Sequence, residues 1–117
     1  MKANSSHQIG LTLIELLIVM AIIAFLIAVA MPNFVKARGL SQRNACISNL
    51  KQIDVAKSTW ALENKKPDTA SPNNSDLFGP TGYIPQQPAC PANGTYTLDI
   101  IARKPSCSFA ISEGHTL

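Results

Sequence analysis

The sequence predicts an α+β protein in which one long N-terminal helix, transmembrane at first and amphipathic afterwards, packs against a small antiparallel β-sheet head. Three observations lead to this prediction. Residues 11–31 form a dense apolar block, apolar residues then recur with a helical period as far as residue 63, and two short runs near the C-terminus alternate with a period of two. The 117 residues are 46% hydrophobic and 15% charged. This composition excludes general disorder, and so short a chain is not expected to be an enzyme with a roomy cleft.

The apolar block is expected to be a transmembrane helix. Within residues 11–31 the only charged residue is Glu15, and the only other polar residue is Thr12. As a helix the block would be about 30 Å long, enough to cross the hydrocarbon core of a bilayer. It is longer than the apolar core of an ordinary secretory signal. The alternative, a buried helix of a soluble protein, is not favoured, because the rest of the chain could not surround it.

A short polar segment, residues 1–10, precedes the block and has the character of a removable leader peptide. Gly10 ends this segment, Leu11 follows it, and Glu15 lies four residues further on. This junction, with Pro32 just after the block, resembles the N-terminal signature of type IV pilins and of the pseudopilins of type II secretion. The resemblance implies cleavage after Gly10 by a prepilin peptidase, N-methylation of Leu11, and a role for Glu15 in filament assembly.

The chemistry of the junction agrees with these implied roles. Gly10 has no side chain, so a peptidase can approach the backbone closely. Cleavage would leave a charged amine on Leu11, and Glu15 lies one helical turn away from it. The carboxylate could simply neutralise its own amine, or it could pair with the amine of a neighbouring subunit and fix the register of a filament. We favour the second interpretation, because charges inside membranes are usually functional.

The resemblance also implies a location and partners. The chain would be a single-pass protein of the bacterial inner membrane, with its head outside the cytoplasm and lipid around the block. It would then join copies of itself, on a pilus or type II secretion assembly platform, in a periplasmic or cell-surface filament. The positive-inside tendency alone favours the opposite orientation, because basic residues are more numerous after the block than before it. We nevertheless favour the orientation with the head outside the cytoplasm, because the leader must meet a peptidase that faces the cytosol.

The helix is expected to continue past the membrane over residues 32–63. Pro32 removes one backbone donor, so we expect a helix kink just before it. Beyond it, one face collects the apolar residues Cys46, Leu50, Ile53, Ala56, Trp60 and Ala61. Lys57 lies in the same sector, and we expect its ammonium group to reach outward into solvent. A helix of residues 11–63 would be about 80 Å long, which suits a filament subunit better than a small globule.

Residues 64–117 are expected to form a small, loop-rich head. The first part, residues 64–91, is rich in Pro, Asn, Ser, Asp and Gly and should be loop, with four apolar anchors: Leu77, Phe78, Tyr83 and Ile84. Residues 95–100 and 106–111 should then pair as an antiparallel hairpin. The side chains expected to face the helix are Tyr96, Leu98 and Ile100 from one strand and Cys107, Phe109 and Ile111 from the other.

The chain has three cysteines, which cannot all pair with one another. If the head is exported, a disulfide would help to hold so small a sheet, and the preferred pair is Cys90–Cys107, with Cys46 left as a buried thiol. Pairing of Cys46 with either head cysteine, which would fasten helix to sheet, is the open alternative. A metal site with His7 or His115 is not expected, because the spacing contains no C-x-x-C or H-x-x-x-H element, and no cofactor is expected.

Two functions from different classes remain. The first is a structural filament subunit, of a pilus or of a pseudopilus. The second is a minor or competence-type pilin that binds DNA or a surface through basic residues: Lys65, Lys66, Arg103 and Lys104. Nucleic-acid binding is the less favoured of the two, because such charges usually form an ordinary solvated face. The acidic calcium loop of major pseudopilins is not matched either, since Asp99 and Glu113 stand alone.

Overall fold

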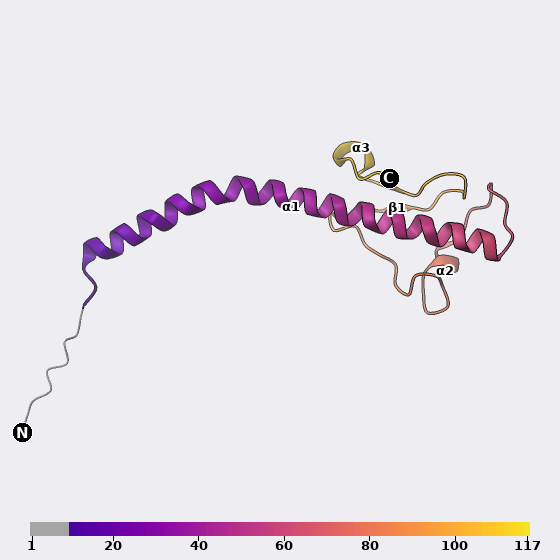
Figure 1. Cartoon of the computed structure of the whole chain (residues 1–117), viewed down its shortest axis with the longest axis horizontal. Coiled ribbons are helices and arrows are strands. Elements are labelled where there is room, and N and C mark those ends of the chain that lie inside the picture. The colour runs from indigo at the N-terminus through magenta and orange to yellow at the C-terminus, as the bar shows by residue number, and fades with distance from the viewer. Residues whose placement is uncertain (1–9) are drawn as a thin grey trace, which may run out of the picture. The chain divides into compact units, whose positions relative to one another are not determined.

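The computed structural model describes residues 10–117 (Figure 1). The predicted leader peptide, apart from Gly10, lies outside these residues. Two compact units meet between Ala37 and Arg38, and helix α1 (Leu13–Glu63) belongs to both. The other elements follow in the order α2 (Asn74–Leu77), β1 (Tyr96–Thr97), β2 (Ser106–Cys107) and α3 (Ala110–Glu113). The predicted α+β class, with one long N-terminal helix and a small antiparallel sheet, is confirmed.

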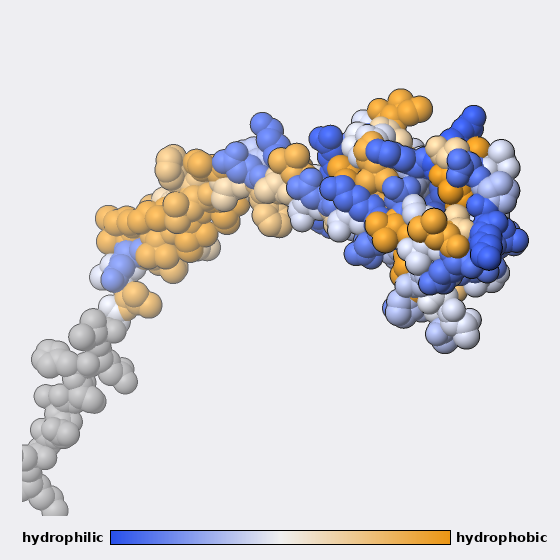
Figure 2. All heavy atoms as spheres, turned by 45° about the vertical axis from the view of Figure 1, so that its right-hand side comes forward, coloured by the Kyte–Doolittle hydropathy of each residue, from blue (hydrophilic) through white to orange (hydrophobic). Residues whose placement is uncertain are grey.

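The first unit is formed by the N-terminal part of α1, and the face that Figure 2 shows is apolar over most of its length, with polar residues near its two ends. Its large side chains are exposed, as illustrated by Leu13 at 82% and Phe25 at 70%. Within residues 10–117, α1 is the one helix that is long and apolar enough to cross a membrane, judged by length and composition. Pro32 lies inside α1 and does not end it, because a proline removes only one hydrogen bond of the helix. The kink at Pro32 stays a prediction.

The second unit contains the C-terminal part of α1 and the head, and the predicted apolar stripe forms its core. All six stripe residues are buried: Cys46, Leu50, Ile53, Ala56, Trp60 and Ala61. All of them except Ile53 belong to one of two clusters. Around Cys46 and Leu50 the head contributes Cys90, Cys107, Tyr96 and Phe109, and around Trp60 it contributes Leu77, Phe78, Tyr83 and Ile84. The head therefore uses the whole stripe, and its four predicted loop anchors pack where they were expected.

Helix α1 ends at Glu63 because the chain turns back on itself there. Lys65 adopts a left-handed conformation with φ of 49°, and the N–H of Lys66 donates to the carbonyl of Ala61 at 2.9 Å. This is the hydrogen-bond pattern of a Schellman motif, which satisfies carbonyls that the end of a helix leaves without partners. The chain then runs as loop, interrupted by the single turn of α2, as the composition of residues 64–91 predicts.

The predicted hairpin forms, but its strands are only two residues long. Tyr96 pairs with Cys107 and Thr97 pairs with Ser106, in antiparallel register. The prediction of longer strands is wrong, because the backbone that follows β1 has other partners. The N–H groups of Ile101 and Ala102 donate to the carbonyls of residues 70 and 68, respectively, at 2.9 Å each. The carbonyls of residues 98, 100 and 103 accept hydrogen bonds from one lysine side chain instead of from a strand.

The end of the second predicted strand is a short helix. Phe109 packs against the core as predicted, but it precedes α3, and Ile111 is fully exposed rather than inward-facing. The N–H of Glu113 donates to the carbonyl of Phe109 at 3.0 Å, and Gly114 closes the turn in the left-handed conformation with φ of 67°. This turn brings His115 into the core, where it is 1% exposed.

Candidate functional site

The predicted cleavage junction lies just outside the regular helix. Gly10 and Leu11 are exposed, and α1 begins two residues later at Leu13. A methyl group built on Gly10 would meet no other atom within 4 Å, so the surroundings of the junction are open. A peptide bond in this position is accessible to an enzyme without unwinding of the helix.

Glu15 takes part in the N-terminal cap of α1. The N–H of Glu15 donates to Thr12 Oγ1 at 3.2 Å, and the N–H of Thr12 donates to Glu15 Oε2 at 3.4 Å. This reciprocal pair is a capping box, in which two backbone donors at the helix start find partners. Our sequence prediction placed Glu15 in assembly and missed this contact. The signal was present in the Thr-x-x-Glu spacing directly before an apolar run.

Lys57 is buried, so the prediction that it reaches outward is wrong. Its side chain is 1% exposed, and its ammonium group donates to three carbonyls, those of Leu98 at 2.5 Å, Ile100 at 3.0 Å and Arg103 at 2.7 Å. Loss of hydration lowers the pKa of Lys57, although Asp54 and Asp99 partly oppose this. The lysine thus replaces the backbone donors that a longer sheet would have supplied.

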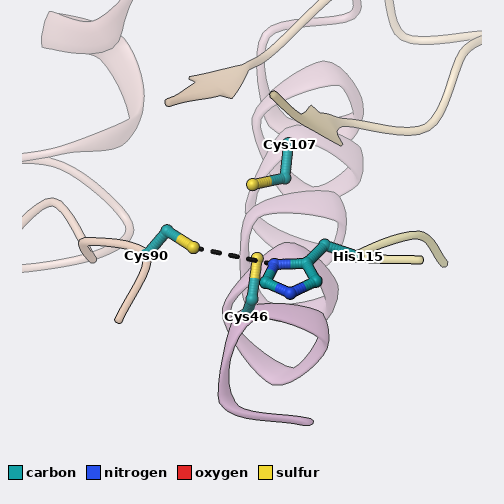
Figure 3. Close-up of side chains that lie close together, drawn as sticks. All are labelled: Cys46, Cys90, Cys107 and His115. Carbon is teal, nitrogen blue, oxygen red and sulfur yellow. Dashed lines mark hydrogen bonds between the residues drawn. The ribbon is translucent and has the colours of Figure 1, made fainter. Parts of the chain in front are cut away.

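The three cysteines and His115 meet in the core of the second unit, between α1 and the head (Figure 3). They come from α1, from the loop before β1, from β2 and from the segment after α3. All four side chains are buried, and their possible ligand atoms lie within 4.8 Å of one another. The sulfurs are not bonded to one another. The predicted pair Cys90–Cys107 is brought together, but so is Cys46, and the disulfide stays a prediction.

The thiols of this cluster have different electrostatic surroundings. Burial raises the pKa of Cys46 to about 12. Burial acts in the same direction on Cys90, but hydrogen bonds from the backbone N–H groups of Ala92 and Gly94, and a contact with His115, outweigh it and bring the pKa of Cys90 to about 7. Sequence reasoning could not join His115 to the cysteines, because the four residues lie on separate segments.

Comparison with known proteins defines the class of this chain. Residues 5–31 match the family model of the prokaryotic N-terminal methylation motif. This stretch contains the junction, the capping box and most of the apolar helix of the first unit. The chain is therefore a protein of the prepilin type.

Relatives extend the similarity into the head. The chain is 36% identical over 78 residues to the type IV major pilin protein PilA of Myxococcus xanthus, a match that covers 67% of this chain and 32% of the pilin. It is 29% identical over 98 residues to the competence protein ComGC of Halalkalibacterium halodurans, covering 84% of this chain and 91% of that protein. It is also 39% identical over 79 residues to the type IV major fimbrial protein FimA of Dichelobacter nodosus, covering 66% and 49%.

These findings identify the family. The chain belongs to the family of type IV pilins and pseudopilins. It spans about a third of the Myxococcus pilin and about half of the Dichelobacter fimbrial protein, but nearly the whole competence protein. No solved structure matches it significantly.

Proposed function

We propose that the chain is a structural subunit of a type IV pilus or pseudopilus filament, without catalytic activity of its own. It is inserted in the bacterial inner membrane, with its head outside the cytoplasm. A prepilin peptidase cleaves it after Gly10 and methylates Leu11, and an assembly platform then joins the subunits through α1. The observation that carries this proposal is the exposed apolar surface of the first unit, which begins directly at the junction.

The exposed surface needs an external partner. Burying one large apolar side chain is worth about 1.5–3 kcal/mol, and the first unit exposes more than a dozen of them. Contiguous apolar surface of this extent marks an interaction with a membrane or with other proteins. Lipid satisfies it before assembly, and the same helices of neighbouring subunits satisfy it in a filament. A helix without one preferred apolar face is suited to both environments.

The primary test is the mass and assembly of the protein extracted from membranes. We expect an intact mass that corresponds to a chain starting at methylated Leu11, and filaments that contain this chain. Gly10→Leu should leave the leader attached and prevent assembly, because a bulky side chain blocks close approach of the peptidase. Gly39→Ala is the matched control, since a methyl group there also meets no atom within 4 Å. A wild-type filament containing uncleaved chain would contradict the proposal.

The proposed role of Glu15 in assembly can be separated from its role in the helix cap. Glu15→Leu should insert and be cleaved normally but give few or no filaments, because the contact with a neighbouring Leu11 amine is lost. Glu15→Gln keeps an oxygen that can accept the N–H of Thr12 but removes the charge. If the charge fixes the register, Glu15→Gln should fail like Glu15→Leu. Filament counts by electron microscopy, at equal amounts of cleaved subunit, give the answer, and wild-type counts for Glu15→Gln would reject the charge pairing.

A second candidate function is that of a competence-type pilin that binds DNA. Two observations favour it: the match to 91% of a competence protein, and two exposed basic pairs in the head, at residues 65–66 and 103–104. Part of this charge is already engaged, since Arg103 lies 3.7 Å from the Asp99 carboxylate. The chain in detergent micelles would then bind duplex DNA with a steep salt dependence. Replacing Lys65 and Lys66 by Ala should reduce the slope by about 2, because each phosphate contact contributes about 1.

The matched control for DNA binding is Lys36→Ala, which removes an exposed positive charge from the first unit. It should leave the salt dependence unchanged. Binding that is weak and nearly independent of salt in the unmodified chain would eliminate the second candidate and leave the filament subunit as the single function.

A further inference from the structure

We propose that Cys46, Cys90, Cys107 and His115 bind one zinc-type divalent metal ion in a closed tetrahedral site of three sulfurs and one nitrogen. Nothing in the sequence spacing or in the relatives' names assigns such a site. The four side chains converge from separate segments onto one point of the core (Figure 3). The proposal concerns the second unit, residues 38–117, and does not depend on the proposed filament function.

The geometry of the cluster is close to that of a zinc site. Zinc binds cysteine sulfur at about 2.3 Å and histidine nitrogen at about 2.0–2.1 Å, so the ligand atoms of a tetrahedral site lie about 3.5–3.8 Å apart. Cys90 Sγ and His115 Nδ1 are 3.8 Å apart, and all four ligand atoms lie within 4.8 Å of one another. Adjustments of less than about 1 Å in side-chain positions would complete the tetrahedron.

The groups around the cluster orient and support its ligands. The second nitrogen of the His115 ring, Nε2, lies 3.4 Å from the carboxylate of Glu113. A histidine that binds metal through one nitrogen usually donates its other N–H to a carboxylate or carbonyl, and Glu113 is in position for this. A purely apolar core would not need this contact.

The site is tightly enclosed. A methyl group built on Gly94 would lie 2.7 Å from Cys107 Sγ, 2.8 Å from Phe109 Cδ2 and 3.2 Å from Cys90 Sγ. The backbone at Gly94 therefore packs directly against two of the sulfurs. Four protein ligands in an enclosed core leave no open coordination position for a substrate, so the ion would be structural.

The donor set indicates the kind of metal. Three thiolates and one imidazole suit zinc and disfavour calcium or magnesium, which prefer oxygen ligands. Binding would release the thiol protons to solvent and would require no oxidant or reductant. A sulfur that holds the ion cannot also form a disulfide, so the metal site and the predicted Cys90–Cys107 bridge exclude each other.

A metal at this position would compensate for the small core of the head. Cys46 lies on α1, whereas the other three ligands lie on segments 44 or more residues further along the chain. One ion would thus fasten the loop before β1, strand β2 and the C-terminal segment to the helix. Small domains commonly use a metal or a disulfide in place of a larger core.

The first experiment measures metal and thiols in the full-length chain, purified in detergent without chelators and with free thiols blocked at lysis. We expect one zinc per chain by elemental analysis and native mass spectrometry. We also expect three cysteines that react with a thiol reagent only after chelation. A Cys90–Cys107 disulfide in this material would overturn the proposal. So would less than stoichiometric zinc, both as isolated and after the reduced protein is incubated with zinc.

The second experiment tests the ligands one by one with Co²⁺ in place of zinc, because tetrahedral Co²⁺ bound to thiolates has a characteristic visible and near-ultraviolet absorption. Cys107→Ser and His115→Gln should each lower zinc affinity at least 100-fold and change this spectrum. Leu50→Ala is the control for loss of packing, since Leu50 is buried in the same cluster but offers no ligand. Glu113→Gln, at an exposed position, should lower affinity 10–100-fold. Wild-type affinity in both ligand variants would overturn the proposal.

Discussion

Two stretches of α1, residues 13–35 and residues 46–61, differ in how far their apolar side chains are exposed. In the first stretch apolar residues occur on all faces, and every one of them is exposed in the monomer. In the second stretch most of them follow one stripe that the head covers, and Val55, which lies off this stripe, stays 66% exposed. An apolar surface on all sides cannot be covered by a head of 54 residues, 64–117, whereas a single stripe can. The pattern of a helix, more than its hydrophobicity, therefore indicates whether its partner lies inside or outside the chain.

The largest effect is expected where the second stretch buries a charge. Lys57→Met should lower the free energy of unfolding of the head by about 3–5 kcal/mol, because three buried carbonyls lose their donor. Chemical denaturation followed by the fluorescence of Trp60, the only tryptophan, measures this loss. Lys51→Met, at an exposed position of the same helix, should change stability by less than about 0.5 kcal/mol. Equal losses in the two variants would show that the three hydrogen bonds contribute little.

Replacing an exposed apolar residue by a charged one should have different effects before and after the end of the apolar block. Ile22→Arg should disfavour membrane insertion by about 2.5–3.5 kcal/mol, because Ile22 lies near the middle of the apolar block. Leu62→Arg, at a position that is 80% exposed in the second unit, should leave insertion and stability nearly unchanged. Membrane fractionation together with Trp60 fluorescence tests both variants. Normal insertion of Ile22→Arg would remove the distinction between the stretches.

A smaller effect is expected at the helix cap of the first stretch. Thr12→Ala should destabilise the start of α1 by about 1 kcal/mol, because the N–H of Glu15 loses its acceptor. Faster amide hydrogen exchange at residues 13–15 would report this fraying. Thr59→Ala is the comparison inside the helix, where the hydroxyl only donates to the carbonyl of Val55 and alanine is the better helix former. Unchanged exchange in Thr12→Ala would mean that solvent replaces the cap.

The sequence allowed the prediction of features that depend on neighbours along the chain. The extent of α1, the buried stripe and the loop anchors all follow from periodicity and turn composition, and the junction motif pointed to the family. The C-terminal region was less predictable. Residues 95–100 alternate like a strand, but the carbonyls of residues 98 and 100, together with that of residue 103, accept hydrogen bonds from Lys57, a residue more than 40 positions away. No local pattern contains that contact.

The same limitation explains the cysteine cluster. Spacing rules for metal sites recognise ligands that lie close together on one segment, such as C-x-x-C. Here each ligand is contributed by a different segment, and His115 enters the core only because α3 replaces the end of the predicted strand. The correct placement of Cys107 beside the helix stripe was predictable from its strand phase. The convergence of all four residues required the tertiary structure.

The burial of Lys57 has a consequence for covalent labelling. An amine with three carbonyl partners and 1% exposure is hidden from acylating reagents, whereas Lys51, Lys65 and Lys66 on either side of it are exposed. Loss of hydration also lowers the pKa of Lys57. Exposure to solvent removes this effect, so the uncovered amine would have the ordinary reactivity of a lysine. Acylation of Lys57, read against its exposed neighbours in the same sample, would therefore report how often the head opens from the helix, whether the subunit is in detergent, in a membrane or in a filament.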